Sequence, residues 1–270
     1  MKSFSIPIIS SKLEKNTDQV LAEAEINGIE LEYLWPKYAG RSLFTGVFAA
    51  AGSDGLGFSF AAEIPHNKVI AERTEPHTRV FDEDCLEVFI QPPASKTIPA
   101  PQTESPQTDK QNCTYYCWEI NPNGACLDYC VDYGPAVDSL AGTTEEEHAA
   151  FKAKSTYTGQ ESVRGKLYDF VAEKPLFFDY DRIPKAKWVQ SVDDEFWYLE
   201  LFVPYSSLGL SEPPKAGDIW KATFNRIDAP RTKPGQKKDN PKPGLASLLE
   251  DTNWPKFHQP EHFAELVFTE

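Results

Sequence analysis

The sequence has few basic residues for its size, a single methionine and no long apolar run, and each shortage narrows the possible functions. Its 27 Lys and Arg stand against 41 Asp and Glu, which gives a formal charge of −14. Because a chain without excess positive charge cannot neutralise many phosphates, we expect no nucleic-acid partner. No apolar stretch approaches the ~20 residues of a membrane-spanning helix, so we expect no membrane partner either.

The first twelve residues also lack the features of an export signal. Their apolar run, residues 6–9, is short and is interrupted by Pro7. A secretory signal has an apolar region of about 7–15 residues. We therefore expect a cytoplasmic protein.

Cysteine is scarce, and the five residues present are an odd number: Cys85, Cys113, Cys117, Cys126 and Cys130. Four of them flank a Pro-Asn-Gly turn with the spacing Cys-x3-Cys on each side, whereas zinc knuckles usually have Cys-x2-Cys. A one-residue bulge, common in such turns, would send the two pairs to opposite faces. We expect reduced core thiols and no metal site; a zinc site or disulfides are the alternatives.

Helical periodicity is rare, and apolar residues instead alternate with polar ones. This alternation predicts strands at Leu43–Ala51, Gly57–Glu63, Cys85–Gln91, Tyr115–Asn121, Ala125–Val131, Lys187–Val192, Phe196–Val203, Trp220–Ile227 and Glu265–Thr269. Helices are expected at Thr17–Ala24, at Thr144–Lys152 and as one turn after Pro204. The predicted fold class is all-β: a single β-sandwich of two mostly antiparallel sheets with short peripheral helices.

Two segments break the alternation and are expected to be loop excursions within one domain that spans residues 1–270. Residues 92–111 are rich in Pro, Thr, Ser and Gln, which predicts a mobile loop. Residues 231–244 place five basic residues among three prolines. We expect a solvated basic loop there, and binding of an anionic ligand or partner is the alternative.

Three of the expected strands carry a glutamate among large apolar residues: Glu87, Glu119 and Glu200. Burying an unpaired polar group costs on the order of 2–7 kcal/mol, so each carboxylate must be paired, hydrogen-bonded or directed at a ligand. Arg226 is a natural partner because its guanidinium donates two hydrogen bonds at once. For Glu200 we favour a structural network; for Glu87 and Arg226 a ligand site and a structural network both stay open.

Several aromatic residues lie where no strand periodicity requires them. Phe81 precedes the Glu87 strand, and Trp254 and Phe257 lie in a proline-bounded segment before the last strand. Sugar rings have apolar C–H faces and a rim of hydroxyls, so their sites combine aromatic rings with carboxylate, amide or guanidinium groups. The alternative is that these aromatics close one end of the sandwich. The candidate sugar contacts are Phe81, Glu87, Asn225, Arg226, Trp254 and Phe257.

Four sequence blocks, in this order, resemble carbohydrate-binding module family 9 and its wider DOMON-like relatives: residues 84–90, 116–124, 197–204 and 257–266. The resemblance implies a β-sandwich that binds the ends of sugar chains, usually as an appendage of secreted glycoside hydrolases. It implies that Phe81 and Phe257 occupy the places of two tryptophans that clamp the sugar, and that Glu87 matches a glutamate that binds hydroxyls. Glu119 matches a family arginine, which reverses the charge. Glu119 and His258, the latter in the last block, join the candidate ligand-binding residues.

The expected function is non-catalytic binding of a sugar or oligosaccharide end, without a cofactor. One alternative is a glycoside-processing enzyme that uses two of the three glutamates, whose carboxyls would have to lie ~5–5.5 or ~6.5–9.5 Å apart across a cleft. A haem-binding relative would need His258 or His262 as axial ligand, since Met1 is the only methionine. The last alternative is a protein-interaction domain that keeps the fold without a sugar site.

Overall fold

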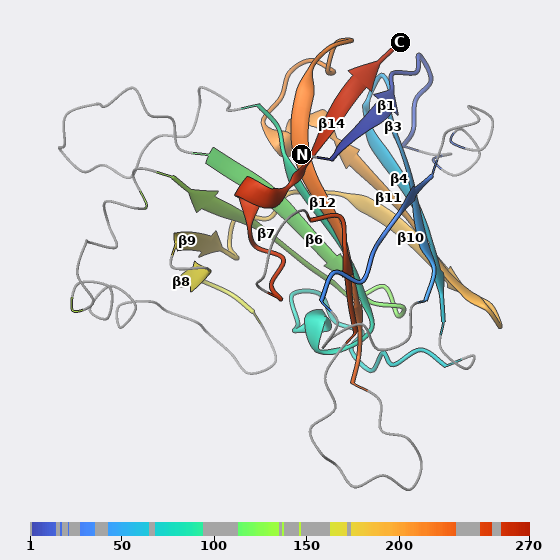
Figure 1. The fold of residues 1–270 in the computed structure, drawn as a ribbon, viewed down its shortest axis with the longest axis vertical. Helices are drawn as coiled ribbons and strands as arrows, with labels where there is room; N and C mark the ends of the chain where they lie inside the picture. The colour runs from blue at the N-terminus through green and yellow to red at the C-terminus, as the bar shows by residue number, and fades with distance from the viewer. Residues whose placement is uncertain are drawn as a thin grey trace, which may run out of the picture.

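The computed structural model describes residues 2–14, 17, 21, 28–35, 43–64, 68–93, 113–134, 137, 146, 163–171, 174–230, 244–249 and 255–270. These residues form two β-sheets packed face to face (Figure 1). The larger sheet has nine strands in the order β1-β14-β12-β5-β6-β7-β9-β8, with β13 paired to β12, and the smaller has five in the order β10-β11-β4-β3-β2. Only β1 and β14 pair in parallel among these strands. The all-β sandwich predicted from the sequence is confirmed.

The nine-stranded sheet consists of β1 (Ser3–Pro7), β5 (Cys85–Gln91), β6 (Cys113–Ile120), β7 (Cys126–Tyr133), β8 (Lys166–Val171), β9 (Lys174–Asp179), β12 (Ile219–Asp228), β13 (Gly244–Ser247) and β14 (Ala264–Thr269). The five-stranded sheet consists of β2 (Ile29–Glu30), β3 (Thr45–Ala51), β4 (Gly55–Glu63), β10 (Lys187–Val192) and β11 (Phe196–Pro204). Short 3-10 turns are η3 (Val80–Asp82), η4 (Tyr205–Leu208) and η5 (Pro260–His262).

All nine predicted strands are present, with ends within two residues of the expected ones. The turn after Pro204 is present as η4. The alternation missed β1, β2, β8, β9 and β13, which are short, mixed in composition or start inside an expected loop. The two predicted helices and the excursion at residues 92–111 lie almost wholly outside the described residues, as does most of the basic loop.

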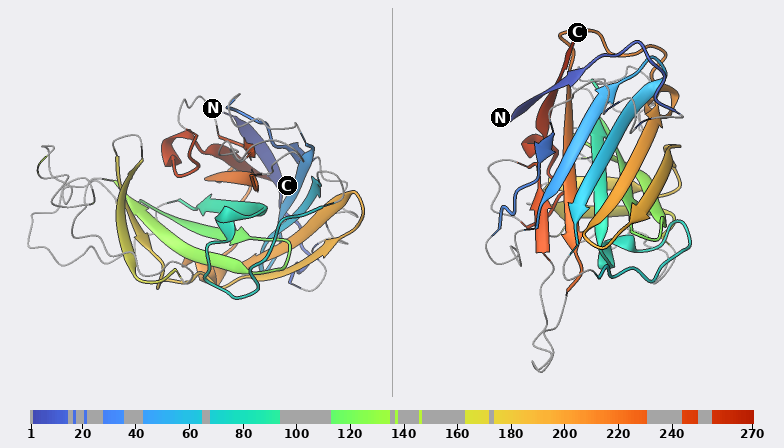
Figure 2. Two further views of the ribbon diagram at one scale, coloured as in Figure 1. Left: turned by 90° about the horizontal axis from the view of Figure 1, so that it is seen from below. Right: turned by 90° about the vertical axis from the view of Figure 1, so that its right-hand side faces the viewer.

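Strand β5 shows how alternation divides the side chains between two environments. Leu86, Val88 and Ile90 point between the two sheets and join the main core. Cys85 and Phe89 point to the opposite side of the large sheet and join a second apolar cluster. The large sheet curves around that side, and the segment that precedes β14 lies within the curve (Figure 2, left). We call this side the concave face.

The turn between β6 and β7 sends the two cysteine pairs to opposite sides of the sheet, as predicted. Cys117 pairs with Tyr129 in the register and lies in the concave-face cluster, whereas Cys126 pairs with Ile120 and lies in the core between the sheets. All five cysteines are free thiols. Among the described residues, no three His, Cys, Asp or Glu side chains gather in a way that could hold a metal ion. None of the described helices has the length and hydropathy of a membrane span.

Candidate functional site

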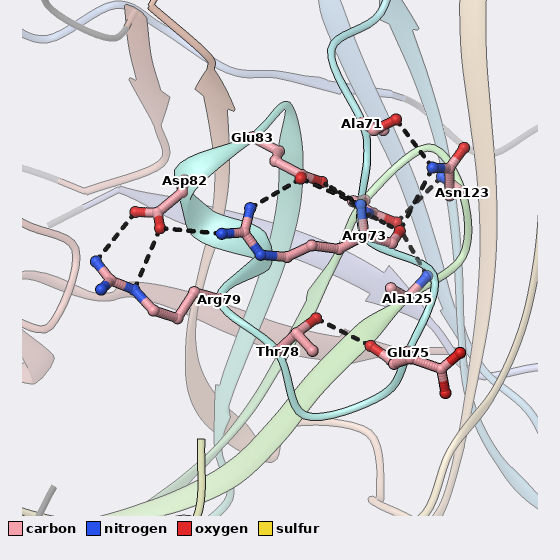
Figure 3. A network of polar contacts seen from close by, with 10 residues as sticks. Ala71, Arg73, Glu75, Thr78, Arg79, Asp82, Glu83, Asn123 and Ala125 are labelled. Atoms are coloured by element: carbon pink, nitrogen blue, oxygen red, sulfur yellow. Dashed lines mark hydrogen bonds and ion pairs between the residues drawn. The ribbon is translucent and has the colours of Figure 1, made fainter. Parts of the chain in front are cut away.

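The acidic residues that precede β5 are occupied by internal partners (Figure 3). Arg73 Nη1 donates to Glu83 Oε1 at 2.8 Å, and Asn121 Nδ2 donates to Glu83 Oε2 at 2.9 Å. Arg79 pairs with Asp82 at 3.2 Å. These contacts tie residues 71–84 to the β6–β7 turn. The cluster therefore acts as a structural clamp at one end of the large sheet.

Asp84, the last residue of this cluster, has a structural role as well. Its two carboxylate oxygens accept hydrogen bonds from the backbone N–H groups of Ile70 and Ala229, at 2.7 and 2.8 Å. Ala229 directly follows β12, so Asp84 fastens β5 and β12 together at their shared end. Its negative charge is matched by two oriented donors, which is a stable arrangement for a buried carboxylate.

Three candidate residues meet on the concave face. Glu87 on β5 lies directly opposite Glu119 on β6 and, on its other side, opposite Asn225 on β12. Asn225 Nδ2 donates to Glu87 Oε2 at 3.1 Å. The three side chains are 2%, 3% and 0% exposed, so no ligand can reach them without movement of the residues above. They form a buried polar centre under an apolar layer.

Asn225 is held in one orientation by its other contacts. Its Oδ1 accepts from Thr223 Oγ1 at 2.9 Å and from Ser247 Oγ at 2.6 Å. Because both hydroxyls donate to the same oxygen, the amide nitrogen must face Glu87. The strand β13, which supplies Ser247, thus helps to place the buried carboxyl pair.

His258 extends this polar centre toward the surface. Tyr129 donates to Glu119 Oε1 at 2.5 Å, and its hydroxyl oxygen lies 3.1 Å from His258 Nε2. The other ring nitrogen, Nδ1, lies 2.9 Å from the hydroxyl of Tyr115. Since the proton of Tyr129 is committed to Glu119, His258 must donate from Nε2 and accept at Nδ1. The hydrogen bonds therefore run in one direction, from Tyr115 through His258 and Tyr129 to Glu119.

The charge states follow from burial. Desolvation raises the pKa of Glu87 well above its usual range, with repulsion from Glu119 as the second cause. Desolvation raises the pKa of Glu119 to about 8, and the hydrogen bond from Tyr129 opposes this shift. Burial, with a smaller contribution from Lys256, lowers the pKa of His258 to about 3. The centre therefore contains a neutral imidazole and two carboxyls that retain at least one proton at neutral pH.

Phe81 and Phe257, the two phenylalanines expected to contact a sugar ring, lie on the concave side. Phe257 is 7% exposed and packs against Trp35, with ring centroids 5.8 Å apart. Phe81 is partly buried against the same cluster, and the guanidinium of Arg79 lies 5.4 Å from its ring centre. Trp254 lies outside the described residues. Phe257 thus serves as a core residue here rather than as an open face for stacking.

Arg226 does not join the group, and its predicted convergence with Glu87 is wrong. It alternates with Asn225 along β12 and points toward the five-stranded sheet. Its guanidinium donates to Asp228 Oδ1 at 2.8 Å, to Thr45 Oγ1 at 2.8 Å and to the carbonyl oxygens of Phe44 and Glu63. Arg226 therefore bridges the two sheets. The physical reason is the two-residue period of a strand, which places neighbours on opposite faces.

Glu200 is separated from the other two glutamates by the fold. It lies on β11 in the five-stranded sheet, opposite Ser59 and Val189. It is only partly buried, on the outer side of that sheet. Only Glu87 and Glu119 can act as a pair.

A pocket of about 250 Å³ opens on the concave face next to His258. Sequence reasoning did not select its other lining residues, because they come from the end of β7, from β9, which the alternation missed, and from the turn η5. A neighbouring proline is the feature of the sequence that could have drawn attention to Lys174 and Glu261. The polar and aromatic residues that line it are Tyr133, Lys174, His258 and Glu261.

Comparison with known proteins identifies the fold but no sequence family. No family model and no curated protein matches the sequence. A provisionally named carbohydrate-binding protein of Bacteroides uniformis aligns with 99% of each chain at 15% identity and a TM-score of 0.60. A carbohydrate-binding module family 9 domain of Caldicellulosiruptor kristjanssonii in complex with cellotriose aligns with 99% of this chain and 94% of that chain, at 12% identity and a TM-score of 0.52.

A family 9 domain of the same organism in complex with glucose gives a TM-score of 0.52 at 11% identity, over 99% of this chain and 96% of that chain. The chain has a family 9-like fold. At these identities the likeness concerns the fold alone. The side chains of the site must be interpreted from their own geometry.

That geometry disfavours a catalytic pair of glutamates and haem ligation by His258. Glycoside hydrolysis needs two carboxyls that flank a bound sugar, whereas Glu87 and Glu119 are almost fully covered. Axial haem ligation by His258 would need a free imidazole nitrogen, and both of its nitrogens are bonded to tyrosine hydroxyls.

Proposed function

We propose that the protein binds a neutral carbohydrate, without transforming it, on the concave face of its large sheet. The observation that carries the proposal is an open pocket on that face that is lined by the rings of Tyr133 and His258 and by the charged side chains of Lys174 and Glu261. Sugars need both kinds of contact, because they have apolar C–H faces and many hydroxyls. The complexes of similarly folded domains with glucose and cellotriose support the ligand class.

The charge distribution favours a neutral ligand over an anionic one. The chain carries a net charge of −14, so an anion would be repelled at long range. The imidazole of His258, which adjoins the pocket, has its pKa lowered to about 3 and is uncharged at neutral pH. A neutral sugar is not repelled by the net charge and needs no positive charge on His258.

Moderate affinity is expected. One aromatic contact adds about 0.5–1.5 kcal/mol beyond burial of its area, and each hydrogen bond to a charged group adds about 1.5–3 kcal/mol. One ring and two such bonds therefore provide roughly 3.5–7.5 kcal/mol. This range corresponds to dissociation constants from the millimolar to the micromolar range.

A glycan array followed by calorimetry tests the proposal. We expect at least one neutral sugar to bind with a micromolar to millimolar dissociation constant and to be recovered unchanged after long incubation. Absence of binding to every sugar at millimolar concentration would contradict the proposal. Cleavage of the bound sugar would contradict its non-catalytic part.

A second candidate function is protein interaction through the other sheet. Phe44, Val189 and Tyr198 are 43%, 66% and 38% exposed, and all three lie on or beside the outer side of the five-stranded sheet. Exposed apolar residues that gather on one face often mark a contact surface. Self-association or partner binding that is lost in Val189→Lys, together with a negative glycan array, would favour this function.

A further inference from the structure

The pocket extends from His258 toward one end of the concave face, away from the buried carboxyl pair. Tyr133, in its wall, pairs with Cys113 at one end of the β6–β7 ladder, whereas Glu119 pairs with Leu127. Six residues of strand separate Leu127 from Tyr133, or about 20 Å at ~3.3 Å per residue. The hydroxyl of Tyr133 donates to Gln91, the last residue of β5, at 2.7 Å. The Tyr133 side of the pocket is thus remote from the end marked by Phe81 and Glu87, and His258 lies between the pocket and the carboxyl pair.

The rim of the pocket carries one donor and one acceptor of opposite charge. Lys174 Nζ lies 2.6 Å from Glu261 Oε1. Their side chains are 58% and 31% exposed, so both heads can rearrange in water to meet a ligand. A surface ion pair of this kind contributes at most about 1 kcal/mol, so its opening costs little. Two adjacent sugar hydroxyls could accept from Lys174 and donate to Glu261 at once.

The walls of the pocket are apolar and rigid. The ring of Tyr133 and the rings of Pro175 and Pro260 line it. His258 adds a fixed ring, stacked on Phe89 at 4.7 Å, with both nitrogens engaged by tyrosines. His258 therefore has no nitrogen available for a ligand. Apolar walls with a polar rim suit a molecule whose faces carry C–H groups and whose edge carries hydroxyls.

The size of the pocket limits the ligand to one ring. Its volume of about 250 Å³ lies just under the ~300–1,000 Å³ of sites for drug-sized molecules. A longer sugar would have to leave the pocket after its first unit. We propose that this pocket holds a single terminal neutral sugar ring, which packs on Tyr133 and bonds Lys174 and Glu261 through adjacent hydroxyls. This assignment rests on the proposed carbohydrate-binding function.

The test compares variants at the two ends of the concave face. Calorimetry is run on the full chain with glucose, galactose, mannose, xylose, cellobiose and xylobiose, and the tightest of these is kept as probe. We expect Tyr133→Ala and Glu261→Gln each to weaken its binding at least tenfold. Glu87→Gln, at the buried end, is expected to change binding less than twofold, because its amide can still accept from Asn225.

Glu32→Gln is the matched control for Glu261→Gln. Glu32 forms a comparable surface ion pair with Lys2 at 2.9 Å, and neither residue lines the pocket. It should leave binding unchanged. Thermal unfolding of each variant confirms that the fold is retained, and Glu261→Gln stays informative if Tyr133→Ala unfolds.

The outcomes separate the two proposals. If the wild type binds a probe and Glu261→Gln and Lys174→Gln bind it equally well, the pocket assignment is overturned while carbohydrate binding stands. Loss of binding in Glu87→Gln alone, with the fold intact, would move the site to the carboxyl end and also overturn it. If the wild type binds none of the panel sugars and no sugar on the glycan array, both proposals fail.

Discussion

Glu87 and Glu119 face each other across neighbouring antiparallel strands, and both carboxyl groups are almost fully sealed from water. Glu87 accepts a hydrogen bond from Asn225, and Glu119 accepts one from Tyr129. Each carboxyl therefore has one donor from a residue outside the pair. The second oxygen of Glu119, Oε2, is buried without a hydrogen-bond partner among the described residues. Two facing carboxylates cannot both ionise cheaply. A proton retained by the pair at neutral pH relieves this repulsion.

Stability should therefore fall as the pH rises from about 6.5 to 8. The folded pKa of Glu119, about 8, lies above its usual value of 4.5, so the folded state binds a proton that the unfolded state has lost. A raised carboxyl pKa stabilises the fold at low pH, and this contribution disappears as the pH rises through the folded pKa. The free energy of unfolding should decrease by up to ~1.4 kcal/mol per pH unit per proton.

Glu119→Gln isolates this contribution, because a neutral amide cannot titrate. Urea unfolding at several pH values should give a flatter profile above pH ~6.5 for this variant than for the wild type, whereas exposed Glu212→Gln should follow the wild type. Below that pH the lowered pKa of His258, about 3, works in the opposite direction: its neutral folded form is disfavoured as the unfolded imidazole protonates. A wild-type profile that is flat between pH 6.5 and 8 would refute the retained proton.

Tyr129→Phe should destabilise the protein by roughly 2 kcal/mol or more. The missing hydroxyl leaves Glu119 Oε1 without its donor and His258 Nε2 without its acceptor, and each unsatisfied buried group costs about 1–3 kcal/mol. Tyr198→Phe, on the exposed outer side of β11, should change stability by less than about 0.5 kcal/mol. Equal stability of the two variants in urea unfolding would show that the Tyr129 hydroxyl is not a required hydrogen-bond partner of Glu119 and His258.

Arg226→Lys should lower stability by about 2–3 kcal/mol without affecting sugar binding. The guanidinium makes four hydrogen bonds to groups on both sheets, and an ammonium cannot reproduce that planar arrangement. The carboxylate of Asp228 would lose a close partner. Arg79→Lys serves as control, since Arg79 is partly exposed and its pair with Asp82 is a surface ion pair. A loss of affinity in stable Arg226→Lys would return this residue to the binding site.

A thiol reagent should modify one cysteine in the folded protein and five in denaturant. Cys113 is partly exposed, whereas the other four are buried. Burial raises the pKa of the Cys130 thiol to about 12 and those of Cys85, Cys117 and Cys126 well above the ordinary value, which keeps the reactive thiolate rare. Cys113→Ser should abolish the native reaction. Fewer than five thiols in denaturant would indicate disulfides or a bound metal.

The placement of individual side chains was predictable wherever it depended on a local rule. The two-residue period of β5 assigned Leu86 to the core and Glu87 to the opposite face, and the turn after β6 separated the cysteine pairs. The same rule argues against Asn225 and Arg226 sharing one site, since they are neighbours on a strand. The attraction between opposite charges suggested a pairing that strand geometry does not allow.

By itself the sequence determined the all-β class, most strands and the face on which each strand residue lies, because these follow from alternation between adjacent residues. The neighbours of each strand were decided only in the tertiary structure, since pairing joins segments far apart in the chain. Glu87 meets Glu119 through the pairing of β5 with β6, and the pocket joins Tyr133, Lys174 and Glu261 from three separate segments. Alternation does not encode which strand edges meet, so the candidate site emerges only when the sheet is assembled.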